Sequence, residues 1–147
     1  MMKSNQKVTK VKLELEQSND YILLGIVSAE PDYKLSLSLN NKFRISLKNI
    51  NPLKLTGNIH SELAFSRFSN DDDPSGLNFS LISNRAGKNF LLNKLKNIDY
   101  LLQIQISEKE ADLNSITLKL REIDSVTAVF NIDLDTIKDK NLHYLTQ

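Results

Sequence analysis

The chain has 147 residues, 40% of them hydrophobic and 25% charged, a composition typical of one globular domain. With 19 basic and 18 acidic residues the net charge is only +1, so no overall charge favours nucleic acid or an anionic membrane. Because cysteine is absent, disulfides, thiolate metal sites and a cysteine nucleophile are excluded. No apolar run approaches the roughly 20 residues that span a bilayer, and we therefore expect a cytoplasmic protein with a flexible tail at 1–8 and a single domain over 9–147.

Two strands and a helix are predicted in the first third of the chain. Residues 8–16 alternate between apolar and polar side chains, whereas residues 21–27 form the continuous apolar run of a more deeply buried strand. Segment 31–42 also alternates as a strand would. However, Pro31 at its start and the apolar spacing of four residues favour a helix.

The middle of the chain reads as short strands. Residues 43–47 alternate as a strand, and turn-forming residues at 49–52 and 56–58 bracket an irregular connection. Residues 61–68 are predicted to form a strand with a local irregularity, and 77–82 pairs with it as a long hairpin across an aspartate-rich loop.

A β-α-β unit with a right-handed crossover is predicted near the C-terminus. A strand at 100–106 precedes a helix at 108–122, which a capping box at Ser107 and Glu110 begins, and a second strand follows at 126–132. One buried helix stripe comprises Leu113, Ile116, Leu120 and Ile123.

Together these elements predict an α+β fold. We expect a two-layer sandwich of a mostly antiparallel sheet and two main helices, at about 31–42 and 108–122. Their order is similar to a ferredoxin-like arrangement with an added hairpin.

Motifs for chemistry are missing. His60 and His143 lie far apart without a ligand pattern, and the aspartates at 71–73 lack the alternating spacing of a calcium loop. The four glycines form no phosphate-binding loop, and no serine has an identifiable base. We therefore expect no catalytic constellation, no metal site and no cofactor.

One cluster of basic residues deserves comparison with nucleic-acid binders. It comprises Arg85, Lys88, Lys94 and Lys96. Phe90 and Tyr100 lie nearby, as in proteins that stack bases on aromatic rings, but the glycine–aromatic pattern of an RNA-recognition motif is absent. We expect the aromatic rings to anchor the core and the lysines to stay solvated.

The same segment resembles a family. Leu-Ile-Ser-Asn-Arg at 81–85, Phe-Leu-Leu at 90–92 and Ile-Asp-Tyr-Leu-Leu at 98–102 are similar to the IPExxxVDY family of small bacterial proteins. Ile98 replaces the valine of the name-giving signature, and Leu92-Asn93-Lys94 stands where Ile-Pro-Glu would be. With weaker matches elsewhere, the resemblance covers most of 21–145.

The resemblance implies no activity, cofactor or partner, but it singles out Arg85, Asp99 and Tyr100 as candidate functional positions. If the family's Pro and Glu did chemical work, Asn93 and Lys94 would abolish it here; a loop-shaping role is simpler. For Asp99, a cap at the start of a strand is the favoured role.

The leading functional hypothesis is a non-enzymatic interaction module, binding a protein partner or a second copy through a sheet edge or the helix layer. The alternative is a small-ligand regulatory domain, which rests on fold analogy alone. A nucleic-acid binder, or an enzyme using Arg85, Asp99 and a lysine, has less support.

Overall fold

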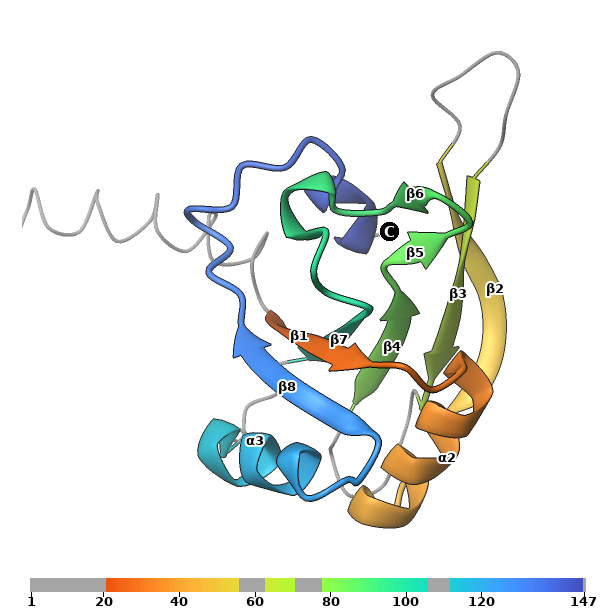
Figure 1. The fold of residues 1–147 in the computed structure, drawn as a ribbon, viewed down its shortest axis with the longest axis vertical. Helices are drawn as coiled ribbons and strands as arrows, with labels where there is room; N and C mark the ends of the chain where they lie inside the picture. The colour runs from red at the N-terminus through yellow and green to blue at the C-terminus, as the bar shows by residue number, and fades with distance from the viewer. Residues whose placement is uncertain (1–20, 56–62, 71–77, 106–111, 147) are drawn as a thin grey trace, which may run out of the picture.

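A six-stranded antiparallel sheet forms the centre of the computed structural model, which describes residues 21–55, 63–70, 78–105 and 112–146 (Figure 1). The strand order is β2-β3-β4-β7-β1-β8. The strands are β1 (Tyr21–Ser28), β2 (Lys48–Leu55), β3 (Leu63–Ser69), β4 (Phe79–Ser83), β7 (Tyr100–Gln105) and β8 (Val126–Asn131). The helices are α2 (Asp32–Phe43) and α3 (Leu113–Arg121).

The strand order confirms the α+β fold. β7 and β8 are both antiparallel to β1, which lies between them, so they are parallel to each other and joined through α3. β1 and β4 flank β7 in the same way, and α2 follows β1. This is the split β-α-β arrangement of ferredoxin-like folds, extended beyond β4 by the added pair β2 and β3.

Helix α2 forms where the sequence predicts it, displaced by one residue. Pro31 occupies the N-cap position, where its missing N–H costs nothing, and its carbonyl accepts from Lys34 and Leu35. The helix ends at Phe43, and the left-handed conformation of the next residue, Arg44 (φ 54°), lets the Ile45 N–H bond to the carbonyl of Asn40.

The predicted strand at 43–47 is wrong. Phe43 is the last residue of α2, and the side-chain amide of Asn40 takes the place of a strand partner for Leu47: its Oδ1 accepts from the Leu47 N–H at 2.7 Å and its Nδ2 donates to the carbonyl at 3.3 Å. The alternation of apolar residues is real burial, since Ile45 and Leu47 both enter the core.

The irregular connection expected around 49–58 is also wrong, because residues 48–55 form β2. This edge strand accommodates Pro52 through a shift of register against β3 between Ile50 and Leu53. The irregularity predicted for the 61–68 strand therefore lies in its partner. The hairpin of β3 and β4 is confirmed.

Helix α3 begins at Leu113, later than the predicted start at 108. Asp112 is its N-cap, and the Asp112 Oδ1 accepts from the Ser115 N–H at 3.2 Å. The stripe from Leu113 to Ile123 packs on the sheet as predicted. The capping box at Ser107 and Glu110 lies outside the described residues, as do the strand at 8–16, His60 and the aspartates at 71–73.

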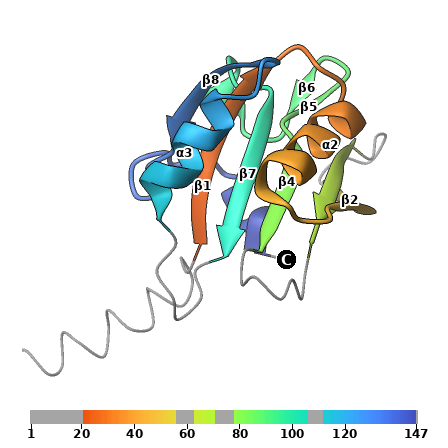
Figure 2. The same cartoon turned by 90° about the horizontal axis from the view of Figure 1, so that it is seen from below.

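Both helices cover one face of the sheet (Figure 2). In β7, Tyr100, Leu102 and Ile104 point into the cluster under the helices, as strand alternation requires. An ion pair of 2.9 Å between Lys42 Nζ and Glu122 Oε1 joins the C-terminal ends of the helix layer, and the hydrogen bond from Lys42 lowers the pKa of Glu122.

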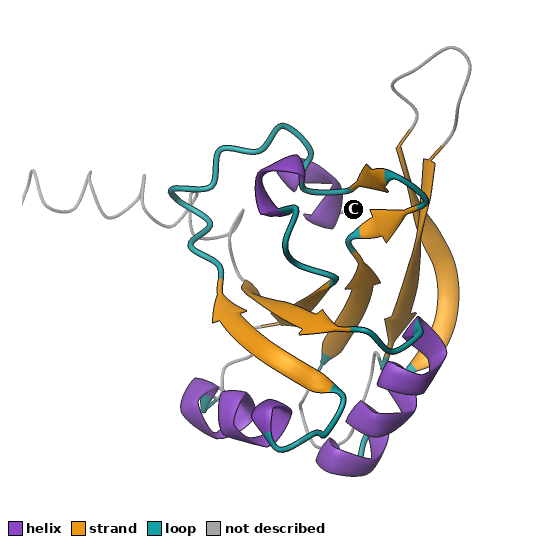
Figure 3. Cartoon of the chain, in the orientation of Figure 1, coloured by secondary structure: helices purple, strands orange, loops and turns teal. Residues whose placement is uncertain are grey.

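A third layer, beyond the two that the sequence predicts, covers the opposite face (Figure 3). We call it the irregular layer: residues 84–98 and 132–146. It contains the short strands β5 (Arg85–Ala86) and β6 (Asn89–Phe90) and the 3-10 turns η1 (Asn93–Leu95) and η2 (Leu142–Thr146). Its apolar side chains pack on Leu23 and Leu101 from the sheet.

Candidate functional site

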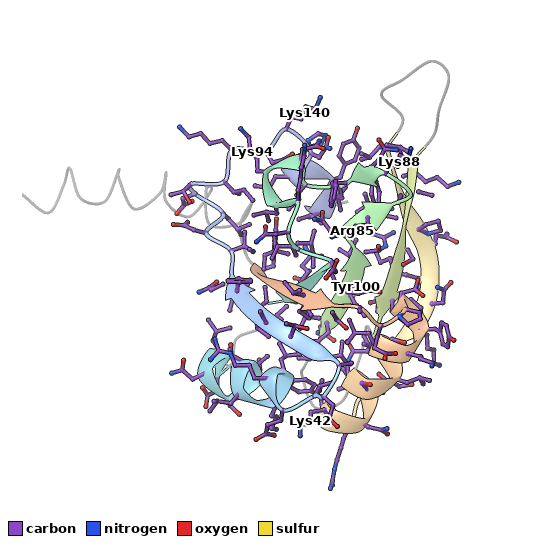
Figure 4. The ribbon with its side chains drawn as sticks, in the orientation of Figure 1. Lys42, Arg85, Lys88, Lys94, Tyr100 and Lys140 are labelled. Carbon is purple, nitrogen blue, oxygen red and sulfur yellow. The ribbon has the colours of Figure 1, made fainter. Side chains whose placement is uncertain are left out.

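The two ends of the motif segment meet at one corner of the sheet. β4 ends at Ser83, which lies opposite Tyr100, the first residue of β7. Asn84 donates its N–H to the Asp99 carbonyl at 2.9 Å. The structure therefore brings Arg85, Asp99 and Tyr100 together, and Figure 4 shows Arg85 and Tyr100 at this corner.

Asp99 joins three parts of the chain. Its Oδ1 pairs with Arg85 Nε at 2.9 Å, and its Oδ2 accepts the N–H of Ser28, the last residue of β1, at 2.9 Å. The carboxylate thus caps the end of a neighbouring strand, which is a structural role of the kind predicted but across strands. The Asp99 side chain is 20% exposed, whereas that of Arg85 is 51% exposed and lies 5.1 Å from the centre of the Phe90 ring.

Tyr100 is buried in the cluster under the helices, and its hydroxyl donates to the carbonyl of Glu30. This bond ties the β1–α2 connection to the central strand. Burial raises the pKa of Tyr100 to about 12, with further contributions from the Asp32, Asp99 and Glu30 carboxylates, so the phenol is neutral and a donor at neutral pH.

Asn84 is the centre of the corner. Its side chain is fully buried; Nδ2 donates to the carbonyls of Leu95 and Ile98 at 2.9 and 3.0 Å, and Oδ1 accepts from Leu92 N–H at 2.8 Å. One amide therefore satisfies three backbone groups of the loop that leads into β7. No motif singles out Asn84, although an asparagine directly after an apolar strand is a signal for such a loop.

Leu92, Asn93 and Lys94, which differ from the Ile-Pro-Glu of the similar family, lead into an exposed turn. Leu92 is buried, whereas Asn93 and Lys94 begin η1 and are exposed. The Lys94 N–H donates to Asp139 Oδ2 at 2.9 Å, so the backbone at this position anchors the C-terminal part of the irregular layer.

The corner offers little for catalysis. The carboxylate of Asp99 and the hydroxyl of Tyr100 are engaged with backbone groups. Arg85, Asp99 and Tyr100 do not line the pocket beside Lys94 and Ile137 or the pocket beside Pro52 and Arg67. The hydrogen bonds and the ion pair of this corner instead have a structural role: they hold β1, β4, β7 and the irregular layer together.

One pocket is an open depression of about 500 Å³ at the end of β8. Its lining consists of Lys94, Leu95, Asn131, Ile132, Asp133, Thr136, Ile137 and Lys138. Within the described part of the chain, neither lysine side chain has an ion-pair partner. The lining thus combines two lysines and one carboxylate, Asp133, with the apolar residues Leu95, Ile132 and Ile137. The second pocket, about 460 Å³, lies on β2 beside Pro52 and Arg67.

The two edges of the sheet differ. β2 contains Pro52, Lys48, Lys54 and a register shift, all of which hinder pairing with another strand. β8 has the sequence Val-Thr-Ala-Val-Phe-Asn, without charge, proline or glycine, and its only irregularity is a bulge near Thr127. No strand of the described ranges lies beyond β8.

The hydrogen-bonding direction of β8 follows from its neighbour. Ile132 donates its N–H to Leu23 in the β1 ladder, so residues two apart from it also face β1. The N–H and C=O groups of Val129 and Asn131 consequently point away from the sheet. Val129 is buried under the helices, and Phe130 projects from the other face, 45% exposed, opposite Gly25.

Across residues 21–55, 63–70, 78–105 and 112–146, no group of three or more potential metal ligands occurs. No helix in these ranges is long and apolar enough to cross a membrane. Comparison with protein-family models, curated proteins and solved structures finds no match to this chain.

Proposed function

We propose that the protein is a non-enzymatic interaction module whose β8 edge binds an extended segment of another chain by strand addition. The observation that carries this function is the contrast between an uncharged, proline-free β8 and a β2 edge that contains Pro52 and two lysines. Strand addition obtains affinity from backbone hydrogen bonds, and the outward groups of Val129 and Asn131 are available for it. A cytoplasmic location and membership of the IPExxxVDY family are parts of this proposal.

The helix layer supports an interaction less well than the edge. Leu37 on α2 and Leu118 on α3 are 57% and 60% exposed, but each lies on the side of its helix opposite the buried stripe. Single exposed leucines are ordinary on protein surfaces. Unpaired backbone groups along an apolar edge strand are unusual, because natural proteins usually block the edges of their sheets against pairing.

The direct test is Asn131→Pro, which removes an outward N–H while leaving the bonds to β1 in place. One lost hydrogen bond, at about 0.5–1.5 kcal/mol, predicts roughly 2- to 12-fold weaker association, and a symmetric complex that loses two predicts roughly 5- to 150-fold. Asn131→Ala, which keeps the N–H, is the matched control.

Association is measured by light scattering over a range of concentrations and by retention of partners from the protein's own lysate. A wild-type protein that stays monomeric at high concentration, and that retains no partner lost by Asn131→Pro, refutes the proposed function.

A second candidate function, small-ligand binding, is favoured by the depression at the end of β8. Its volume of about 500 Å³ fits the range of small-molecule sites, and a lining that combines two lysines with apolar residues suits an anion with an apolar body. Aromatic and branched-chain carboxylates should raise the melting temperature, and Lys94→Ala with Lys138→Ala should remove that rise. Equal shifts in wild-type and double variant would exclude this site.

A further inference from the structure

We infer that the segment bound at the β8 edge is β8 of a second copy, antiparallel, with Val129 opposite Val129. This inference rests on the proposed function and specifies its partner. Closed two-fold dimers are the commonest oligomers, and an antiparallel pair of identical strands is the arrangement that a two-fold axis produces. β8 is suited to it because six uncharged residues place no like charges opposite one another.

Hydrogen-bond direction restricts the register. Only residues whose N–H and C=O groups point away from β1 can form hydrogen-bonded pairs with a second copy. In the regular part of β8 these residues are Val129 and Asn131. In the register centred on Val129, the central pairs involve residues 128–130, the regular part of β8, and Asn131 of each copy lies opposite Thr127 of the other, beside the bulge.

Side-chain size favours the same register. With Val129 at the axis, the exposed ring of Phe130 lies opposite Ala128 of the second copy, a small and half-buried residue on the same face. A slip by two residues in one direction would oppose the two Phe130 rings. A slip in the other would oppose two alanines and place Phe130 opposite Val126, whose side chain is buried in the cluster under the helices.

Charges at the ends of β8 are complementary. Antiparallel pairing brings the start of one strand to the end of the other, so exposed Asp124 of one copy approaches the depression that carries Lys94 and Lys138 in its partner. In the lining of that depression two lysines accompany one carboxylate, Asp133, while the Asp139 carboxylate accepts the Lys94 backbone N–H beside it. Association should therefore weaken as ionic strength rises.

The register is tested with single cysteines, which the natural chain does not contain. Ala128→Cys and Phe130→Cys are purified separately, mixed at a concentration at which the wild type is dimeric, and oxidised mildly. Directly opposite residues in a non-hydrogen-bonded pair have Cα atoms about 4.5 Å apart, within reach of a disulfide. Identical positions would be roughly 8 Å apart, from two steps of about 3.4 Å along the strand and about 4.8 Å across, which is too far.

The expected result is a disulfide-linked dimer from the mixture and none from either variant alone. Crosslinking of Phe130→Cys alone, or of Ala128→Cys alone, overturns the register and supports one of the slipped alternatives. No crosslink from a light-scattering dimer shows that β8 is not at the interface. A monomeric wild type that still retains a partner sensitive to Asn131→Pro overturns the second copy as occupant and leaves the proposed function standing.

The cysteine variants are first checked for native unfolding transitions, since Ala128 is half-buried. Phe130→Lys provides an independent measurement, with Ile50→Lys on the β2 edge as its matched control because both residues are exposed apolar groups on edge strands. We expect at least tenfold weaker dimerisation for Phe130→Lys and an unchanged dimer for Ile50→Lys. Equal effects of the two variants would overturn the assignment of the interface to β8.

Discussion

Replacing Asn84 by alanine should destabilise the protein more than removal of any single surface charge. The buried amide makes three hydrogen bonds, to the backbone groups of Leu92, Leu95 and Ile98, and alanine leaves all three without that partner. At about 1 kcal/mol for each lost bond, and more where the remaining group stays buried, the free energy of unfolding should fall by about 3–5 kcal/mol. That is a large share of the roughly 5–15 kcal/mol by which domains are stable.

The assay is equilibrium unfolding in urea, at a protein concentration too low for self-association to contribute. With a slope of about 1–3 kcal/mol per molar urea, the midpoint should drop by roughly 2 M at unchanged slope. Asn141→Ala is the matched control: Asn141 is also a buried asparagine of the irregular layer, but its side chain donates a single bond, to the Leu91 carbonyl at 2.7 Å. We expect about 1 kcal/mol for the control. If Asn84→Ala costs no more than Asn141→Ala, the amide does not organise the corner as described.

The remaining predictions concern the same corner and its neighbours. Tyr100→Phe should lower the free energy of unfolding by about 1 kcal/mol at neutral pH. Because the pKa of Tyr100 is about 12 when folded against 10 when unfolded, the wild type loses stability as pH rises from 10 to 12, and its free energy of unfolding should approach that of the variant in urea unfolding. A difference that stays constant with pH would contradict the buried phenol. Asp99→Ala should destabilise more than Arg85→Ala in thermal unfolding, because Asp99 also caps β1 whereas Arg85 is half exposed, and the reverse order would refute the cap. Gly25→Ala should lower the free energy of unfolding by about 1–3 kcal/mol, since the added Cβ would lie 2.9 Å from Ile98 Cδ1. In a double-mutant cycle, Ile98→Val should relieve part of this loss, whereas strict additivity of the two substitutions would exclude the contact.

The regular half of the fold could be predicted from the sequence. The continuous apolar run of β1, the Pro31 start of α2 and the stripe of α3 each carry a periodicity that burial then follows. The segment 43–47 shows where periodicity misleads. Its apolar residues are buried as a strand's would be, but the partner is the side chain of Asn40, which no local pattern predicts.

The prediction of an irregular connection in place of β2 was wrong for a related reason. Proline and asparagine argue against a strand, and only the position at a sheet edge with a register shift lets Pro52 remain in one. Edge positions depend on strand order, which is a property of the whole chain. The irregular layer was missed because its apolar residues, such as Leu91 and Ile137, follow no period.

For the candidate site, the sequence identified the residues that meet but not what they do. Arg85, Asp99 and Tyr100 are brought together by the pairing of β4 with β7. Their partners, the Ser28 N–H and the Glu30 carbonyl, are backbone groups from about 70 positions away, so their role could not be derived from spacing. That β8 lies at an edge of the sheet follows from the strand order, which the sequence does not predict.

The attachment of the irregular layer has a consequence for biosynthesis. Its C-terminal half is held by contacts that span 42 to 50 positions: Asp139 to Lys94, Asn141 to Leu91, and Gln103 to Leu145. During translation, β1 and β7 therefore emerge before 132–146, the half of the irregular layer that completes the cover of their far face. Until Leu145 has left the ribosome, only 84–98 can cover Leu23 and Leu101, and the rest of this apolar cluster is open to chaperones or to other nascent chains.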